Sequence, residues 1–310
     1  MRRWFGLAAI AVLLVSALVG VTAAQGAAPG VQVSVLTQFV GTGPAAAAAT
    51  NTGDVVALVG PNLISVGPNG QQKQKIAATI SGGLFGIPIG VAYDKFHQLY
   101  VALPESQGTI LKISPNGKQA TPVPGSEGMV APDGFGLDSE TGNLYVTDIF
   151  GNSIWRITPD GSAEPWTSIA TNPLLVLPDG VKVFNNAVYV SIEAGKILRI
   201  PINPDGSAGS AQVWAQVNES GVFFDDMVLD DRTGDVYVTR LDKNQLLQIT
   251  PGGAITPIAT HADGLLGAAN MALIHAGQNT VIYLANGGVD FLGTGDTGGA
   301  GPALLKITIT

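Results

Sequence analysis

Short segments in which apolar and polar residues alternate recur along most of the chain, and Pro, Gly, Asn and Asp separate them. The clearest example is residues 131–161, APDGFGLDSETGNLYVTDIFGNSIWRITPDG. Alternation with a period of two between turn-forming residues predicts three strands of about five residues joined by tight turns. Residues 163–167 can follow as an outer strand, so the segment predicts a four-stranded antiparallel meander.

This pattern is repeated from residues 87, 177 and 224, and in a divergent form from residue 269. Aligning the residue after the first Pro, or its equivalent, gives spacings of 44, 46, 47 and 44 between the members of one column: Ile89, Asp133, Asp179, Asp226 and Asn270. A weaker copy at 43–70 keeps the hairpin and the closing turn. Since one four-stranded sheet cannot bury both faces alone, a repeat of this length predicts stacked blades. We therefore predict an all-β fold, a six-bladed β-propeller of four-stranded antiparallel blades.

The two ends of the chain are expected to meet. Residues 31–40, VQVSVLTQFV, alternate at the strand period. In closed propellers the first strand often completes the last blade, and residues 304–308 offer a partner strand. This pairing would remove the open edge of the ring.

The first 28 residues have a different composition. Arg2 and Arg3 precede an apolar stretch at 7–21, and small residues follow it. This order predicts a cleaved signal peptide, residues 1–28, and a single propeller domain, residues 31–310. A membrane anchor is the alternative because the apolar stretch approaches spanning length, although no basic stop-transfer cluster follows it. We expect a secreted or otherwise extracytoplasmic protein.

Composition narrows the classes of function. The chain has 310 residues, a net charge of −8, 12% charged residues and no Cys. Mild acidity without basic runs argues against nucleic acid and anionic membrane surfaces. The absence of Cys excludes disulfides, thiolate metal sites and cysteine nucleophiles. We expect a monomer that binds a small-molecule substrate, or a protein or glycan ligand, with no membrane contact after signal removal.

The aligned column carries the first candidate chemistry. Inner strands line the channel of a propeller, so Asp133, Asp179, Asp226 and Asn270 are expected to converge at one mouth, with Asp225 beside them. Converging carboxylates repel one another, and a hard divalent cation with oxygen ligands, such as Ca²⁺, relieves that repulsion. The alternative is that each Asp caps only its own turn. The shared register in four blades favours a metal or polar-substrate site.

Polar residues in loops at the same mouth are candidate substrate contacts: Glu127, Asn172, Glu219, Arg240 and His261. His261 could act as a proton shuttle, and a solvated loop residue is the alternative for each. Asp148 and Glu193 follow second strands and are expected to face this mouth too. His97 and His275 fall in hairpins on the other side and are expected at the surface.

Two further features concern packing and loops. Three aromatic residues are spaced as strand residues and are expected to fill the space between sheets: Trp155, Trp166 and Trp214. The glycine-rich segment 287–301 lies between the second and third strands of the last repeat. We expect it to form a mobile flap over the mouth or a loop at a contact surface.

The tandem phrases Pro-Asp-Gly, Tyr-Val-Thr-Asp and Ile-Trp-Arg-Ile resemble the regucalcin and gluconolactonase family of six-bladed propellers, with NHL-repeat and strictosidine synthase-like relatives. The resemblance covers residues from about 40 to 310. It implies a divalent metal, usually calcium, held at the channel mouth by a first-blade Glu and by later Asn or Asp residues, and hydrolysis of a lactone or ester. Asp226 matches the family's metal ligand and base, Asp179 its Asn ligand, and Asp133 a substrate or metal contact. The family's Gly-Glu-Gly-Pro is Gly-Thr-Gly-Pro at 41–44, without the Glu.

Two classes of function follow from these observations. The first is a secreted, calcium-dependent hydrolase of a lactone or ester with Asp226 as the catalytic residue. The alternative is a noncatalytic NHL-like propeller that binds a protein, glycan or small ligand through its loop face, since propellers host both. A lyase of the virginiamycin-inactivating type is a third.

Overall fold

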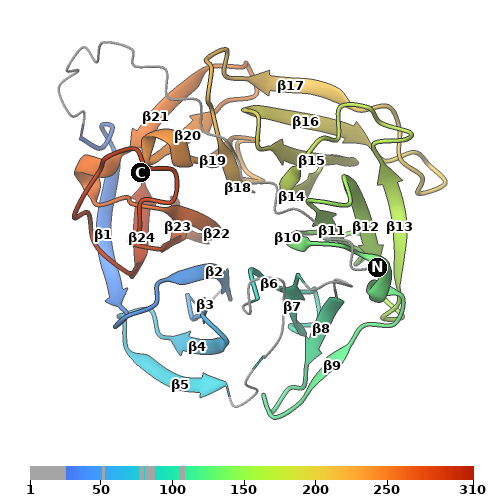
Figure 1. The fold of residues 1–310 in the computed structure, drawn as a ribbon, viewed down its shortest axis with the longest axis horizontal. Coiled ribbons are helices and arrows are strands. Elements are labelled where there is room, and N and C mark those ends of the chain that lie inside the picture. The colour runs from blue at the N-terminus through green and yellow to red at the C-terminus, as the bar shows by residue number, and fades with distance from the viewer. Residues whose placement is uncertain (1–25, 51–52, 77–79, 81–87, 105–108) are drawn as a thin grey trace, which may run out of the picture.

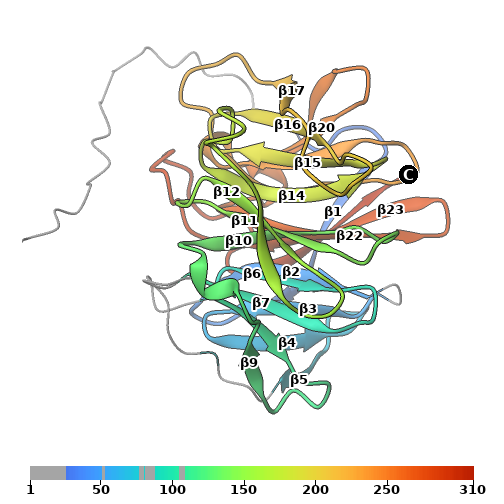
Figure 2. The same cartoon turned by 90° about the vertical axis from the view of Figure 1, so that its right-hand side faces the viewer.

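The computed structural model describes residues 26–50, 53–76, 80, 88–104 and 109–310. Its strands form six four-stranded antiparallel sheets arranged in a ring (Figure 1). From the side, the strands run across the thickness of the ring, so their connecting loops gather at its two ends (Figure 2). The predicted all-β, six-bladed propeller of four-stranded blades is confirmed.

The first three blades follow the order of the chain from the inner to the outer strand. Blade 1 contains β2 (Pro44–Ala49), β3 (Val55–Val59), β4 (Asn62–Val66) and β5 (Gln72–Ile76). Blade 2 contains β6 (Gly90–Tyr93), β7 (Leu99–Leu103), β8 (Thr109–Ile113) and β9 (Ala120–Pro122). Blade 3 contains β10 (Pro132–Leu137), β11 (Leu144–Asp148), β12 (Ser153–Ile157) and β13 (Ala163–Ser168).

Blades 4 and 5 repeat this order, and blade 6 does not. Blade 4 contains β14 (Pro178–Phe184), β15 (Ala187–Ile192), β16 (Lys196–Pro201) and β17 (Gln212–Gln216). Blade 5 contains β18 (Phe224–Leu229), β19 (Val236–Arg240), β20 (Gln245–Ile249) and β21 (Ile255–Ala259). Blade 6 contains β22 (Ala268–Ala276), β23 (Asn279–Asn286), β24 (Ala303–Ile309) and, outermost, β1 (Val31–Gln38). Among the described residues, three short 3-10 helices lie in loops: η1 (Ser126–Gly128), η2 (Leu241–Lys243) and η3 (His261–Asp263).

The ring is closed by its two ends, as the sequence predicts. β1 pairs antiparallel with β24, from Val31 opposite Ile309 to Gln38 opposite Ala303. The outermost strand of blade 6 is therefore the first strand in the described part of the chain, and β24 gains a hydrogen-bonded partner on each side. Pairing both ends into one sheet couples the first blade to the last.

The hydrophobic core lies between the blades. Six clusters of buried residues each join two neighbouring blades, including the pair formed by blades 6 and 1. Tyr145 and Trp166 meet edge to face at 4.8 Å between blades 3 and 4, and Tyr189 and Trp214 meet at 5.5 Å between blades 4 and 5. Trp155 packs between blades 2 and 3. The three Trp side chains therefore fill the space between sheets, as expected.

The remaining expectations concern the two ends of the chain and the insertion. Residues 1–25 lie outside the described residues, so the signal peptide stays a prediction. In the part of the chain that the structure describes, no helix is long and apolar enough to cross a membrane. The glycine-rich segment connects β23 and β24, the second and third strands of blade 6. Asn244 of blade 5 donates a 2.8 Å hydrogen bond to Asp296 and so anchors this loop.

Ring closure predicts a specific sensitivity to mutation. Leu305 of β24 is fully buried between blades 5 and 6, whereas its neighbour Lys306 is partly exposed. Leu305→Ala leaves a cavity and is expected to lower the free energy of unfolding by about 2 to 5 kcal/mol. Denaturant unfolding measures this change, with Lys306→Ala as the matched control. Equal effects of the two substitutions would contradict the role assigned to this interface.

Candidate functional site

The inner strands of blades 3 to 6 share a bulge near their first residues. In β10, Pro132 pairs with Asp148 and Phe135 pairs with Val146, so two residues of β10 face one residue of β11. The same shift occurs between Pro178 and Val181 in β14, between Phe224 and Met227 in β18, and between Ala268 and Met271 in β22. A bulge redirects side chains and often accompanies functional sites. We call the end of the channel at which the inner strands begin the upper mouth.

The bulges correct the alignment of the repeats at blades 5 and 6. The first bulged residue is Asp133 in blade 3, Asp179 in blade 4 and Asp225 in blade 5. Asp226 is the second bulged residue, equivalent to Gly134 and Gly180, and so is Asn270 in blade 6, where the first bulged residue is Ala269. Asp225 therefore takes the position at which the sequence alignment puts Asp226, and the spacing between the three equivalent aspartates becomes regular.

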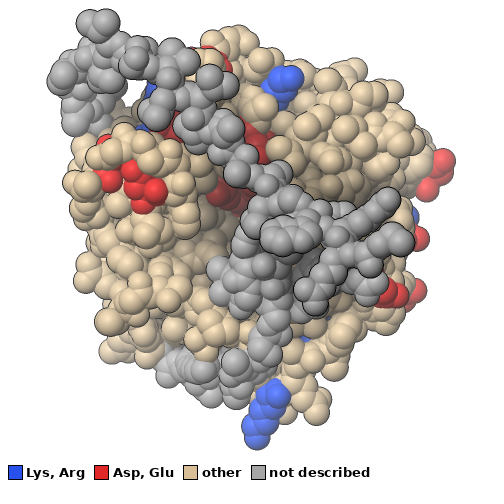
Figure 3. All heavy atoms as spheres, viewed as in Figure 1, with Lys and Arg blue, Asp and Glu red and all other residues tan. Residues whose placement is uncertain are grey.

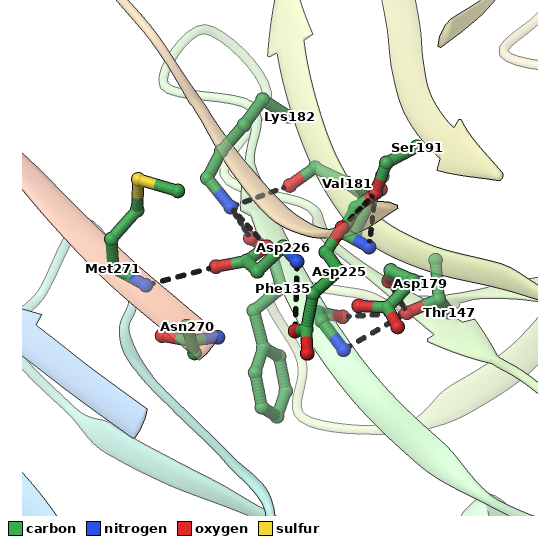
Figure 4. A network of polar contacts seen from close by, with 12 residues as sticks. Phe135, Thr147, Asp179, Val181, Lys182, Ser191, Asp225, Asp226, Asn270 and Met271 are labelled. Carbon is green, nitrogen blue, oxygen red and sulfur yellow. Dashed lines mark hydrogen bonds and ion pairs between the residues drawn. The ribbon is translucent and has the colours of Figure 1, made fainter. Parts of the chain in front are cut away.

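Hydroxyl groups on the second strands hold this register. The Ser191 hydroxyl accepts a hydrogen bond from Gly180 N at 2.7 Å and donates to the carbonyl oxygen of Asp225 at 2.7 Å (Figure 4). Thr147 makes the equivalent bonds, to Gly134 N at 2.9 Å and to the Asp179 carbonyl oxygen (Figure 4). The Thr239 hydroxyl lies within donating distance of two carbonyl oxygens, that of Asp226 in its own blade at 3.1 Å and that of Ala269 in blade 6 at 3.3 Å. Each hydroxyl thus connects the inner strands of two neighbouring blades at the bulge.

Glycine is required beside these bridges because the inner strands approach closely. A Cβ atom on Gly134 would lie 2.5 Å from the carbonyl oxygen of Asp179. A Cβ atom on Gly180 would lie 2.4 Å from Asp226 Oδ1. The Gly of Pro-Asp-Gly in blades 3 and 4 therefore has a steric reason besides turn formation.

Four carboxyl groups from blades 3 to 5 form a carboxylate cluster at the upper mouth: Asp133, Asp179, Asp225 and Glu193. Burial raises the pKa of Asp225 to about 7, and the nearby Asp226 and Glu193 add to this. Burial also raises the pKa of Glu193 to about 7. The pKa values of Asp133 and Asp179 are raised well above the ordinary range, by burial first and then by the charge of Asp225. Acidic atoms are visible in the hollow near the centre of this face (Figure 3).

Asp226 has a different environment from Asp225. Its Oδ2 accepts a 3.2 Å hydrogen bond from Met271 N, and its Oδ1 lies 3.6 Å from Lys182 Nζ (Figure 4). Lys182 also donates to the carbonyl oxygens of Phe135 and Val181, both at 2.9 Å. Burial raises the pKa of Asp226, while the Lys182 charge and backbone hydrogen bonds lower it. Asp226 is therefore paired with a cation, whereas Asp225 faces other acids.

Leu177, two residues before Asp179, has a strained backbone. Its φ is 52°, in the left-handed region that bulky side chains rarely adopt. Its N–H donates to Asn152 Oδ1 at 2.8 Å, and its carbonyl oxygen accepts from Glu193 N at 3.2 Å. Such strain is typical of functional sites, where surrounding contacts fix an otherwise unfavourable conformation.

The predicted metal ligands fit a cation only in part. Their donors are oxygens, as Ca²⁺ prefers, and the buried Asp226 Oδ1 accepts no hydrogen bond among the described residues. Asn270 Oδ1, however, accepts from Ala47 N at 3.3 Å, and blade 1 offers only alanines after Pro44 in β2. The described residues contain one group of three acidic or His side chains with ligand atoms all within 4.8 Å, and it is Asp230, Asp231 and His275. An ion in the carboxylate cluster would therefore need these side chains to close on it, or water to complete its shell.

Most of the predicted substrate contacts in loops at the upper mouth form hydrogen bonds with neighbouring residues of the protein. Arg240 makes paired hydrogen bonds with Glu219 and Asp242, and Asp242 accepts from Phe223 N at 2.8 Å. Asn172 is buried and bonds to Thr167 Oγ1 and to Ala211 N. These contacts fix the loops that lead into β14 and β18.

The other loop residues differ in exposure. Glu127 is exposed in η1, and His261 in η3 contacts the Leu265 carbonyl oxygen through Nδ1 at 2.9 Å. Asp148 is almost fully buried, and its carboxylate accepts from Val130 N and Ala131 N. Asp148 therefore supports the segment before Asp133. Substrate contact by the predicted loop residues remains a prediction.

The two hairpin histidines have different positions. His97 is exposed in the turn between β6 and β7, as expected. The His275 side chain is only 19% exposed and lies 2.7 Å from Asp231 Oδ1, so His275 is not the free surface residue that the sequence predicts. It connects the hairpins of blades 5 and 6 at the end of the channel opposite the upper mouth.

The sequence analysis assigned no role to Lys182 or to the hydroxyl groups of the second strands. It placed Asp225 only next to the aligned residues Asp133, Asp179, Asp226 and Asn270. A usable signal was present, because Tyr-Val-Thr, Tyr-Val-Ser and Tyr-Val-Thr occur in the three blades that carry the aspartates. Lys182 gave no comparable signal, because its partner lies in the next blade. It lines a cavity of about 530 Å³ on the side of the channel away from the upper mouth, where the small alanines of β2 leave space.

The carboxylate cluster predicts a pH-dependent stability. Because the pKa of Asp225 rises from 3.8 to about 7 on folding, the native state binds more protons than the unfolded state between these values. The free energy of unfolding therefore falls as pH rises through this range. Asp225→Asn, which can still accept from Asp226 N, is expected to raise the melting temperature at about pH 8 and to change it little at about pH 4. The exposed Glu140→Gln is the control, and an equal effect at both pH values would contradict the raised pKa.

Comparison with known proteins supports the fold. No protein-family model matches the sequence, and no curated protein matches it significantly. Among solved structures, a gluconolactonase from Xanthomonas campestris is 16% identical, with a TM-score of 0.67 and 92% of each chain covered. Virginiamycin B lyase from Staphylococcus aureus is 13% identical, with a TM-score of 0.59, over 90% of this chain and 100% of that chain.

A third neighbour has another activity. The PQQ-bound aldose sugar dehydrogenase from Streptomyces coelicolor is 14% identical, with a TM-score of 0.65, over 92% of this chain and 100% of that chain. The three proteins have different named activities, so the likeness carries no single reaction. This chain therefore has the six-bladed propeller fold of the gluconolactonase-like proteins, and at these identities the likeness extends to the fold alone.

Proposed function

We propose that the protein hydrolyses a lactone or an ester at the upper mouth, with Asp225 as the general base. The observation that carries this proposal is the half-buried Asp225 carboxyl, whose pKa is raised to about 7 among other carboxyl groups. A carboxylate of ordinary pKa is a weak base, and a base with a pKa near neutrality removes a proton from water more effectively. The gluconolactonase named among the structural neighbours agrees with this class of reaction.

The cluster assigns different roles to its members. Ionised Asp225 accepts a proton from a water molecule, the water oxygen attacks the carbonyl carbon, and the C–O bond to the leaving oxygen then breaks. Burial and the neighbouring carboxyl groups raise the pKa values of Asp133 and Asp179 well above the ordinary range, which favours their protonated forms. A protonated carboxyl group can donate a hydrogen bond to the developing oxyanion. The proton that Asp225 took from water then passes to the leaving oxygen, which regenerates the ionised base.

A divalent cation, with Ca²⁺ as the first candidate, belongs to this proposal. Asp133, Asp179 and Glu193 would hold it in their ionised forms, in place of the hydrogen-bond donation described above, since a cation offsets both the burial of these charges and the repulsion between Asp133 and Asp179. When bound, such an ion supplies Lewis-acid polarisation of the carbonyl oxygen. Asp226 and Asn270 would act less directly, because Asp226 faces Lys182 and accepts from Met271 N, and Asn270 Oδ1 accepts from Ala47 N.

We also propose export and a small-molecule substrate. The Arg2–Arg3 pair and the apolar segment that follows support a cleaved signal, and the net charge of −8 agrees with a protein that binds neither nucleic acid nor anionic membranes. Noncatalytic ligand binding through the loop face is the second candidate function. It is favoured by the alanines of β2, which supply no polar group from blade 1 to the site.

The proposed base predicts the pH dependence of activity. Hydrolysis of a panel of lactones and aryl esters is expected to rise as pH increases through about 7, because Asp225 acts in its ionised form. Asp225→Asn is expected to lower kcat by about 10² to 10⁴. Glu140→Gln, at the other end of the channel, should keep full activity. No turnover of any member of the panel would leave the binding function as the account of this site.

Cation binding is tested separately by calorimetric titration with Ca²⁺. Wild-type protein is expected to bind saturably, and more tightly at about pH 8 than at about pH 5, because protons compete for the carboxylates. Asp179→Asn removes one charged ligand and is expected to weaken binding at least about tenfold, whereas Asp231→Asn, in the separate group with His275, should not. Binding that survives Asp179→Asn but not Asp231→Asn would assign the ion to the opposite end of the channel.

A further inference from the structure

Exposed apolar side chains are distributed unevenly over the two ends of the ring. Of the twelve large hydrophobic side chains that are exposed among the described residues, nine lie on loops at the upper mouth. Five of these nine belong to three loops of blade 3 and form what we call the apolar rim: Val130, Phe150, Ile169, Leu174 and Val176, each 37% to 50% exposed. Large exposed apolar groups gathered at one place on a soluble protein mark binding surfaces.

The apolar rim is connected to the carboxylate cluster by the chain itself. Val130 precedes Asp133 by three residues, and Val176 precedes Asp179 by three residues. Three residues span about 10 Å at most, so each Val lies close to the acid that follows it.

Hydrogen bonds join the three loops of the rim. Ile169 N donates to the Asn152 carbonyl oxygen at 2.9 Å, and Asn152 Oδ1 accepts from Leu177 N at 2.8 Å. Ile149 N donates to the Ala131 carbonyl oxygen at 3.0 Å. The rim is therefore built into the same framework that positions Asp133 and Asp179.

We propose that the apolar rim binds an acyl or alkyl chain of the substrate, so that the protein prefers lactones or esters with a long apolar chain over small hydrophilic ones. This inference rests on the proposed hydrolysis and names its substrate class. The polar head lies at the carboxylate cluster, and the chain covers the exposed side chains of blade 3. Each methylene buried in this way raises kcat/KM about fourfold.

Charge at the mouth distinguishes this occupant from an anionic lipid surface. The cluster contains only carboxyl groups, and Lys182 is already paired with Asp226. Arg240 and Lys243, the cations placed near this mouth by blade 5, bind Glu219. A surface of negative phosphates would meet acidic groups and no unpaired cation among these residues, whereas a neutral substrate with an apolar chain needs no cation.

The test is the dependence of kcat/KM on chain length in a series of lactones that carry an N-acylamino substituent and differ only in its acyl group. Wild-type protein is expected to gain about fourfold per methylene until the rim is covered. Phe150→Ser/Val176→Ser is expected to flatten this dependence and to leave the shortest substrate unchanged. The control is Phe96→Ser, a 69% exposed residue in the hairpin between β6 and β7 at the opposite end of the ring.

A binding experiment separates this inference from the proposed function. Calorimetry with the corresponding lactams, which resist hydrolysis, measures chain-length dependence whether or not turnover occurs. If no lactone is hydrolysed but lactam affinity rises with chain length, the hydrolase proposal is wrong and the apolar rim still binds the chain. The inference is overturned if the double variant keeps the wild-type slope. It is also overturned if the rim residues instead govern binding to phosphatidylcholine vesicles or self-association in sedimentation.

Discussion

The structure depends on the packing of one blade against the next. Each blade is a thin sheet with two apolar faces, and six buried clusters cover those faces pairwise around the ring. Apolar burial of this kind is the main driving force of folding. A ring has no uncovered face only when its last blade meets its first, and the pairing of β1 with β24 achieves this at the edge of blade 6. Closure of the ring therefore fixes the positions of the inner strands around the channel.

The inner strands hold together carboxyl groups that would otherwise repel one another. Asp133, Asp179 and Asp225 come from three blades, and both burial and mutual repulsion disfavour their ionised forms. The Thr147 and Ser191 hydroxyls hold the backbones of Asp179 and Asp225 against the preceding blade, and a glycine permits the close approach. Apolar packing between the blades thus offsets the unfavourable burial of these acids. Their pKa values are raised as a result, and perturbed pKa values are common at functional sites.

Neighbouring residues of one bulge have opposite surroundings. Asp225 interacts with the acids of blades 3 and 4, while Asp226 contacts Met271 N and Lys182. The Asp225 carboxyl group has a pKa of about 7, and the Asp226 carboxyl group is paired with a cation. The apolar rim lies on the loops that precede the same acids, so a single framework positions both the polar centre and the apolar border of the mouth. These two environments make the mouth suited to an amphipathic ligand.

The sequence by itself determined the blade count, the order of the strands, the closing pair and the end of the ring where the acids gather, because these follow from alternation and a repeat of regular length. It could not determine that Asp225, rather than Asp226, matches Asp133 and Asp179, because a bulge shifts the register by one residue without changing the repeat pattern. It could not show the Lys182–Asp226 pair or the role of His275, whose partners lie in the neighbouring blade. Contacts between blades depend on where the side chains of two separate repeats meet, and only the tertiary structure decided that.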